Sequence, residues 1–194
     1  MKQSDIPVKI MVAPASYNEA ELVSQAQLGD RSAFGDLVRH HREGVINVVY
    51  RMCGDPKLAE DAAQEAFIRA WQKLPGYKPR SPFRNWLFRI ATNIALDTLR
   101  RERETVDLEA VQLQTPNASP ESCYDRTEQA ELVRAAVLAL PPASRAVLVL
   151  REYEGLSYRQ IAETLGIPIG TVMSRLNYAR TQLAATLAPL VENQ

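Results

Sequence analysis

One carboxylate pair and two adjacent histidines are the residues of this sequence best suited to chemistry. Asp61 and Glu65 lie four residues apart, so on a helix they could form an acid/base pair or half of a metal site. No Glu-x-x-His motif and no glycine-rich phosphate loop accompanies them. His40 and His41 are neighbours and lack metal-ligand spacing. The sequence therefore predicts no enzyme, no bound metal and no cofactor.

Composition predicts a globular protein of one or two small domains. The chain has 194 residues, of which 24% are charged and 46% hydrophobic. Lys and Arg number 23, as do Asp and Glu, so the total charge indicates no partner. Cys53 and Cys123 lie far apart and are expected to be reduced thiols. No apolar run approaches the roughly 20 residues of a membrane span. We expect a cytoplasmic protein without membrane insertion and without a small-molecule substrate.

Helix signals are frequent, and strand signals are nearly absent. Residues that typically begin helices recur in the first half of the chain: Asn18, Ser32, Pro56, Ser81 and Pro82. They predict an all-α domain over 18–103, preceded by a flexible extension over 1–17. The last helix of this domain would be long, because its periodic pattern continues to Arg103.

Composition changes after this domain. Residues 104–125 contain five acidic and no basic residues, and they show no clear period, so we interpret 104–118 as a flexible acidic linker. Ser119 and Pro120 then begin a second helical domain, 119–187, which leaves 188–194 as a tail. The predicted architecture is two small all-α domains.

The segment from Leu156 to Leu183 has the pattern of a helix-turn-helix. Ser157 can cap its first helix, and Gly166 can provide the left-handed turn that ends it. The second helix has an apolar stripe of Val172, Leu176, Ala179 and Leu183. Its outward set is Thr171, Met173, Ser174, Arg175, Asn177, Tyr178 and Arg180. Polar side chains of this kind can reach base edges and phosphates in the major groove. The alternative is a helical hairpin with merely solvated arginines.

Two further surfaces are indicated in the first domain. Residues 78–103 hold seven basic and two acidic groups, interleaved with Phe83 and Trp86. Such a surface could bind single-stranded nucleic acid, or the aromatic residues could belong to the core, and spacing leaves both open. The preceding helix has a polar stripe that could dock a partner protein or simply face solvent: Asp61, Gln64, Glu65 and Arg69.

Three motifs together resemble the extracytoplasmic-function type of bacterial RNA polymerase sigma factor. They are "DAAQEAFIRAW" at 61–71, "SPFRNWLFRIATNIALDTLRR" at 81–101 and "EGLSYRQIAETLGIPIGTVMSRLNYAR" at 154–180. The resemblance implies a region 2 helical bundle and a region 4 helix-turn-helix. It also implies a subunit that binds core RNA polymerase and directs it to promoter DNA, in a stress or envelope response.

The resemblance implies three sets of functional residues. The set that would bind core polymerase is Asp61, Gln64, Glu65 and Arg69. The set that would recognise and melt the −10 element is Lys78, Arg80, Phe83, Arg84, Trp86, Arg89, Asn93, Arg100 and Arg101. The set that would read the −35 element is Thr171, Met173, Ser174, Arg175, Asn177, Tyr178 and Arg180.

The family implies one further partner, an anti-sigma factor. Met173 stands where the family often has a basic residue, which removes a phosphate or base contact from the −35 set. Two other functions are weighed against this one. An autonomous helix-turn-helix regulator would bind duplex DNA without polymerase. A hydrolase built on Asp61, Glu65 and the two histidines would require a bound metal.

Overall fold

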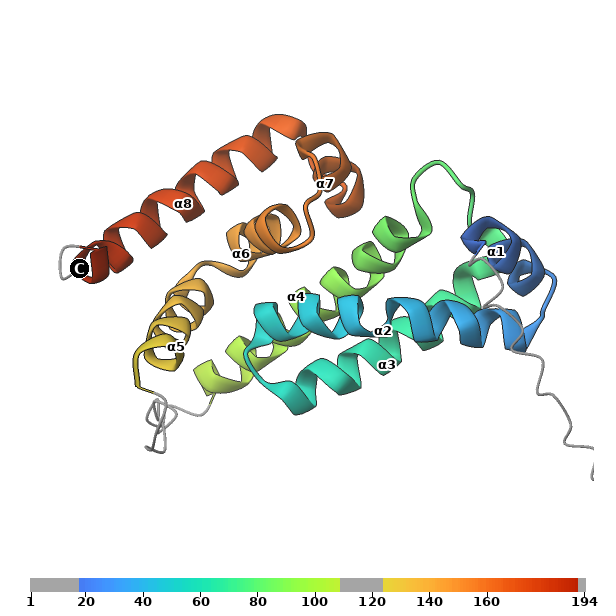
Figure 1. Ribbon diagram of the computed structural model, residues 1–194, viewed down its shortest axis with the longest axis horizontal. Coiled ribbons are helices and arrows are strands. Elements are labelled where there is room, and N and C mark those ends of the chain that lie inside the picture. Colours follow the sequence, from blue (N-terminus) through green and yellow to red (C-terminus); the bar gives the residue numbers. More distant parts are fainter. Residues whose placement is uncertain (1–17, 109–123, 192–194) are drawn as a thin grey trace, which may run out of the picture.

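The computed structural model describes residues 18–108 and 124–191, and every regular element in these ranges is helical (Figure 1). The all-α class is confirmed for these residues. In chain order the elements are α1 (Glu19–Gln27), α2 (Arg31–Cys53), α3 (Pro56–Lys73), the 3-10 turn η1 (Leu74–Gly76), α4 (Phe83–Leu108), α5 (Tyr124–Ala139), α6 (Pro142–Leu148), the π-helical turn η2 (Val149–Tyr153), α7 (Tyr158–Leu165) and α8 (Ile169–Val191). The expected extension 1–17, Ser119 with Pro120, and most of the acidic linker lie outside the described residues.

Side-chain caps fix several helix ends. Asn18 caps α1 and Ser157 caps α7, as the sequence predicted, and the Gln160 side chain completes a reciprocal capping box with Ser157. The predicted cap at Ser32 is wrong. Asp30 caps α2 instead, because its Oδ1 accepts a hydrogen bond from the Ser32 backbone N–H at 2.8 Å. An ionised carboxylate is a stronger acceptor for these N–H groups than a hydroxyl.

The first domain is a bundle of α2, α3 and α4, with α1 packed across one end (Figure 1). α3 turns a row of small side chains toward its neighbours: Ala59, Ala62, Ala63, Ala66 and Ala70, all buried. Small residues let helices approach closely, and larger residues of α2 and α4, such as Leu37, Met52 and Phe88, fill the remaining core. This packing leaves the opposite face of α3 and one face of α4 at the surface.

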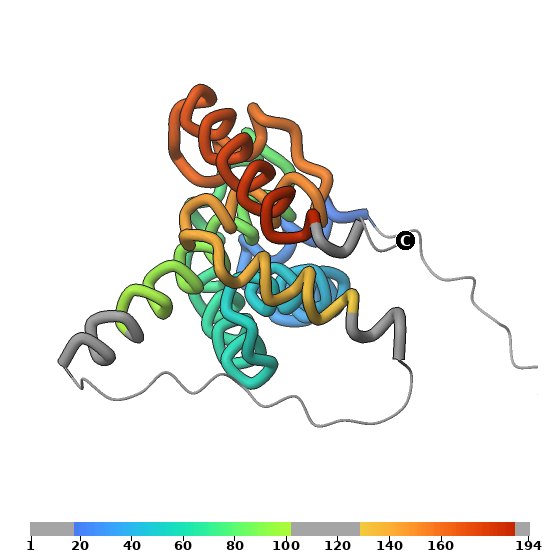
Figure 2. The backbone as a smooth tube through the Cα atoms, turned by 90° about the vertical axis from the view of Figure 1, so that its left-hand side faces the viewer, coloured from blue at the N-terminus to red at the C-terminus, as the bar shows by residue number. Residues whose placement is uncertain are grey.

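The second domain begins with α5 and ends with the predicted helix-turn-helix. α8 packs on α6 and α7, and Figure 2 shows it on the far side of the domain from the first-domain bundle. Gly166 ends α7 with φ 66°, and its N–H donates to the Ala162 carbonyl. This left-handed residue provides the sharp turn into α8. α8 continues to Val191, beyond the expected domain end at 187.

The two domains pack against each other. α6 and α7 lie against α4, and α5 lies against α2 (Figure 1). The side chain of Arg145 is only 7% exposed and donates hydrogen bonds to the carbonyls of Met52, Leu138 and Leu140, the last at 2.8 Å. Carbonyls at a helix C-terminus lack partners within their own helix. One guanidinium therefore serves the ends of α2 and α5 together.

The turn at the end of α2 also depends on this packing. Gly54 has φ 80°, and a Cβ at this position would lie 2.7 Å from Leu138 Cδ1 of α5. We expect Gly54→Ala to lower the free energy of unfolding by about 2 kcal/mol or more, since a left-handed conformation costs a non-glycine residue roughly 1–2 kcal/mol and Leu138 must also move. Urea unfolding of the full chain, followed by circular dichroism, measures this change.

The matched control is Gly35→Ala on the same helix. Its new methyl group would meet only the Arg39 guanidinium, at 3.6 Å. We expect this variant to gain roughly 0.5–1 kcal/mol, because alanine orders a helix interior at a lower entropic cost than glycine. Equal effects of the two substitutions would contradict the special role of the α2 turn.

Candidate polymerase and nucleic-acid interfaces

The predicted docking stripe lies on the outer face of α3, opposite the alanine row. Asp61 and Gln64 are exposed, whereas Glu65 and Arg69 are half-buried. Arg69 Nε donates a hydrogen bond to Glu65 Oε1 at 2.6 Å, which is an ion pair at i,i+4 spacing. The stripe therefore presents the Asp61 carboxylate beside a preformed ion pair, and all four predicted residues share one surface.

Ile68 belongs to the same surface and was missed by the sequence reasoning. Its side chain is 54% exposed, and it lies three residues after Glu65 and one before Arg69. The signal was its register: Ile68 falls outside the buried alanine row of α3. An exposed apolar residue ringed by polar ones is typical of a protein interface.

The polar members of the predicted −10 set are all exposed: Lys78, Arg80, Arg84, Arg89, Asn93, Arg100 and Arg101. The aromatic members are placed differently. Phe83 is 3% exposed and packs in the core, whereas Trp86 is half-buried with its ring centroid 5.4 Å from that of Phe83. In this arrangement the surface offers many cations for phosphates and only part of one indole ring for base stacking.

The loop between η1 and α4 is held by side chains. The Tyr77 hydroxyl donates to the Ser81 carbonyl at 2.8 Å, and Gln27 Nε2 donates to the carbonyls of Leu74 and Tyr77 at 3.0 and 2.8 Å. Burial raises the pKa of Tyr77, so its hydroxyl remains a donor at neutral pH. Between this loop and α1 lies a pocket of about 390 Å³, lined in part by Arg80. An anchored loop with a pocket beneath it can hold a small planar group.

Both histidines contact neighbouring side chains of the first domain. His41 Nε2 lies 2.9 Å from Glu19 Oε2, and its ring centroid lies 5.6 Å from that of Phe83. Burial lowers the pKa of His41, and the Glu19 carboxylate partly opposes this effect. The ring of His40 meets it edge-on at 4.9 Å. In the described part of the chain, no three residues of the metal-binding types gather closely enough to hold an ion.

The docking stripe and the −10 set meet at a second pocket. It has a volume of about 410 Å³ and lies between α3 and α4, where Arg69 and Lys73 face Trp86, Arg89 and Asn93. Lys73 was not predicted, because a single lysine at a helix end gives no sequence signal. Three cations beside a partly exposed indole could neutralise a phosphate next to an unpaired base.

The structure places the predicted −35 set on one side of α8. Val172, Leu176 and Ala179 are buried, as the stripe predicted. The exposed members are Met173, Ser174, Asn177, Tyr178 and Arg180, and the half-buried members are Thr171 and Arg175. α8 therefore presents a mixed polar and apolar face, as a recognition helix must.

Arg180 is engaged within its own domain. Its Nη2 lies 2.6 Å from Glu152 Oε1, and its Nε donates to the same oxygen at 3.2 Å. This hydrogen bond raises the pKa of the Arg180 guanidinium, which is charged in any case. Of the two arginines on α8, Arg180 must exchange this partner before it can bind a phosphate.

Two members of the −10 set, Arg84 and Arg89, lie next to the second domain although both remain exposed. Arg84 forms an ion pair with Glu154, which follows η2 and is only 7% exposed in its side chain. Arg89 lies beside the turn of the helix-turn-helix, with Nη2 3.6 Å from the position of a Cβ on Gly166. In the described arrangement, Arg84 has a protein partner from the second domain and Arg89 lies near its turn.

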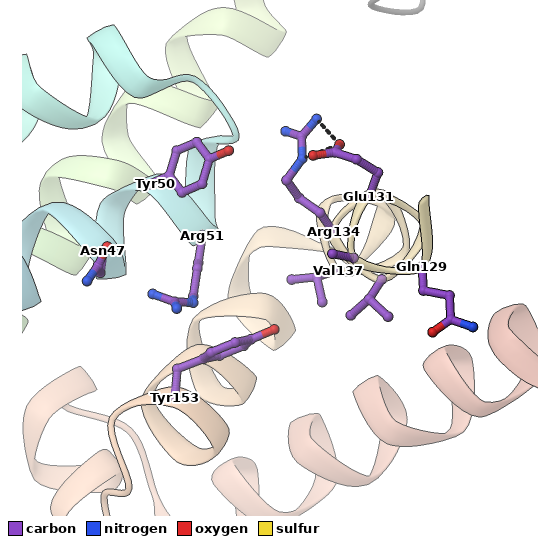
Figure 3. A pocket seen from close by; sticks show the side chains of 10 residues that line it. Asn47, Tyr50, Arg51, Gln129, Glu131, Arg134, Val137 and Tyr153 are labelled. Atoms are coloured by element: carbon purple, nitrogen blue, oxygen red, sulfur yellow. Dashed lines mark hydrogen bonds and ion pairs between the residues drawn. The ribbon is translucent and has the colours of Figure 1, made fainter. Parts of the chain in front are cut away.

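A groove runs between the two domains on another side (Figure 3). It has a volume of about 610 Å³ and is lined by residues of α2, α5 and η2. The Arg51 guanidinium lies 4.2 Å from the centroid of the Tyr153 ring, and Val133 is 36% exposed on the α5 wall. A ligand in this groove would contact both domains at once.

Comparisons with known proteins identify both domains. Residues 37–105 match the family described as Sigma-70 region 2, and residues 130–183 match Sigma-70, region 4. The ECF RNA polymerase sigma factor SigW of Bacillus subtilis is 34% identical over 179 residues, which cover 87% of this chain and 96% of that protein. SigE of Mycolicibacterium smegmatis, also an ECF RNA polymerase sigma factor, is 37% identical over 97% of this chain and 71% of its own length.

Two solved structures are similar in fold. CnrH in complex with the cytosolic domain of CnrY has a TM-score of 0.67 and 29% identity, over 88% of this chain and 97% of CnrH. RpoE of Bartonella quintana in complex with the anti-sigma factor NepR has a TM-score of 0.67 and 26% identity, over 80% and 96%. Within the described residues, no helix is long and apolar enough to cross a membrane. The chain belongs to the extracytoplasmic-function group of sigma-70 RNA polymerase sigma factors.

Proposed function

We propose that this sigma factor binds core RNA polymerase through the outer face of α3 and reads two promoter elements with its two domains. The observation that carries the proposal is that the basic face and the candidate recognition helix lie in different domains. The basic face belongs to α4 and the polar face to α8, and the covalent link between their domains is the segment between α4 and α5. Two tethered surfaces fit two separated DNA elements.

The family consists of transcription initiation subunits, which are not enzymes. We extend this to the present chain and assign Asp61 and Glu65 to polymerase docking, not to acid/base chemistry. Their stripe lies on an exposed helix face and includes the apolar Ile68. Charged residues around an apolar centre are the usual composition of a transient protein interface. The cytoplasm, where core polymerase resides, is the proposed location.

Run-off transcription with core polymerase on genomic fragments tests the function directly. We expect defined start sites with the wild-type chain. The double variant Asp61→Ala/Glu65→Ala should weaken the affinity for core at least tenfold, or about 1.4 kcal/mol, because it removes both carboxylates of the stripe. Fluorescence anisotropy with labelled sigma factor and core polymerase measures this affinity.

The control variant removes the same charge elsewhere. Glu21 and Glu43 are exposed on α1 and α2, so Glu21→Ala/Glu43→Ala should keep the wild-type affinity for core. If core bound the two double variants equally well, α3 would not be the docking helix.

On this proposal, the −10 set binds promoter DNA fully only after the two domains separate. Arg84 is held by Glu154, and α6 and α7 pack against α4. While the second domain stays in place, DNA would have to compete with Glu154 for Arg84 and would meet α6 and α7 beside α4. Core polymerase would supply the binding energy that separates the domains, because it would engage each domain through a different surface.

Glu154→Gln tests this opening. The substitution keeps the shape of the side chain and removes the charge that holds Arg84. We expect a several-fold gain in the affinity of the isolated chain for a labelled single-stranded oligonucleotide, because the closed arrangement loses an interdomain ion pair. Glu163→Gln is the matched control: Glu163 forms an ion pair with Arg159 inside α7, at 3.2 Å. The opening model predicts no gain for that control, and equal gains would refute it.

An anti-sigma factor is the proposed inhibitory partner. One of the two similar structures holds the sigma factor RpoE in complex with the anti-sigma factor NepR, and the other holds CnrH in complex with the cytosolic domain of CnrY. In the present chain, the groove between α2, α5 and η2 is a site where one helix would contact both domains and stabilise their closed arrangement.

Photocrosslinking in the native host tests this site. A photoreactive residue in place of Val133, on the groove wall, should capture a protein whose deletion raises transcription from the mapped promoters. The same residue in place of Arg39, exposed on α2 outside the groove, should not capture it. Capture from position 39 alone would place the inhibitor elsewhere.

A further inference from the structure

The tip of α8 exposes large apolar side chains. Of the eight large hydrophobic residues that are exposed in the described part of the chain, three lie on this helix: Ile169 (50%), Met173 (54%) and Tyr178 (45%). Ile169 and Met173 are four residues apart and therefore lie near one another on the helix, at the edge of the buried stripe that holds Val172 and Leu176. This is the end of the helix that a helix-turn-helix directs toward base edges.

The charges around these residues fit nucleic acid better than an apolar protein surface. The sequence of α8 contains Arg175 and Arg180 and no acidic residue. A helix that docks in a protein groove can carry carboxylates on its surface, whereas carboxylates on this helix would repel a polyanion. Charge complementarity therefore favours a polyanion as the ligand of this face.

Several polar groups on this helix already have partners. The Ser174 hydroxyl donates to the Thr171 carbonyl at 3.1 Å, and Arg180 is bound by Glu152. The Ser174 hydroxyl and the Arg180 guanidinium are therefore less available to base edges, and apolar contact is the interaction open to Ile169 and Met173. In the major groove, the C5 methyl group of thymine is the apolar feature that distinguishes base pairs.

We propose that Ile169 and Met173 read the upstream promoter duplex through the C5 methyl groups of thymine. The inference rests on the proposed function and names the chemistry of its −35 contact. Four residues of helix span about 6 Å, close to two base-pair steps of roughly 3.4 Å each. The two side chains can thus contact methyl groups on different base pairs, and Arg175, on another face of the same helix, is left for phosphate.

The test uses the holoenzyme reconstituted from core polymerase and the full chain. A duplex pool randomised upstream of the mapped start site yields the preferred element. Synthetic promoters then carry deoxyuridine in place of thymidine only within that element, which removes the methyl groups and leaves every hydrogen bond. We expect about a fourfold loss of promoter affinity per contacted methyl, the factor for removing one buried carbon group. Met173→Ala and Ile169→Ala should each bind the two promoters with a smaller difference.

Two controls separate this effect from general DNA binding. The same number of deoxyuridines in the spacer should leave affinity unchanged. Arg175→Ala should weaken binding to thymine and uracil promoters by the same factor, since it is assigned to phosphate. Unchanged affinity for the uracil element would overturn the proposal, as would a full uracil penalty retained by both alanine variants. Either result would leave promoter-specific transcription intact, whereas failure of the proposed function would abolish it for every promoter.

Discussion

The placement of the second domain on the first depends on the buried guanidinium of Arg145. A charge in an almost dry site is costly unless its donors are satisfied, and here the acceptors are carbonyls from the ends of α2 and α5 together with Leu140. Helix C-termini carry partial negative charge, so they suit a cation that cannot lose its proton. Because these acceptors come from both domains, the guanidinium ties α6 to the C-terminal end of α2.

The three proposed functional surfaces differ in how closely the other domain approaches them. The stripe on α3, with Asp61 and Ile68, is exposed, as is the tip of α8. On α4, Arg84 and Arg89 face the second domain. On the proposed function, docking on polymerase would need no prior separation of the domains, whereas full contact of α4 with promoter DNA would. A sigma factor built in this way would engage DNA mainly after it has found its enzyme.

The helices and the register of their faces could be predicted from the sequence because the signals are local. The Asn18 cap, the Ser157 cap and Gly166 each act within a few residues, and the structure confirms all three. Ser32 failed because Asp30, two residues earlier, was a stronger competing acceptor. The family resemblance supplied the functional surfaces that periodicity alone left open.

The remaining features depend on contacts between distant parts of the chain. Arg84 and Glu154 are 70 residues apart, and no local pattern pairs them. Spacing could not decide whether Phe83 stacks on bases or packs in the core, because both uses place an aromatic ring on the same helix. The structure places the Phe83 ring in the core, beside His41 and Tyr77. Ile68 was overlooked for a related reason, since an apolar residue in an apolar helix is conspicuous only after the buried face is known.

The π-helical turn η2 has a consequence for how this protein can evolve. Successive residues at its end reach three different helices: Glu152 binds Arg180 of α8, Tyr153 lies under Arg51 of α2, and Glu154 binds Arg84 of α4. Each residue of an ordinary helix is rotated by about 100° from the last. Deleting one residue here would misdirect all three side chains at once, so the junction should tolerate a single substitution better than a change of its length.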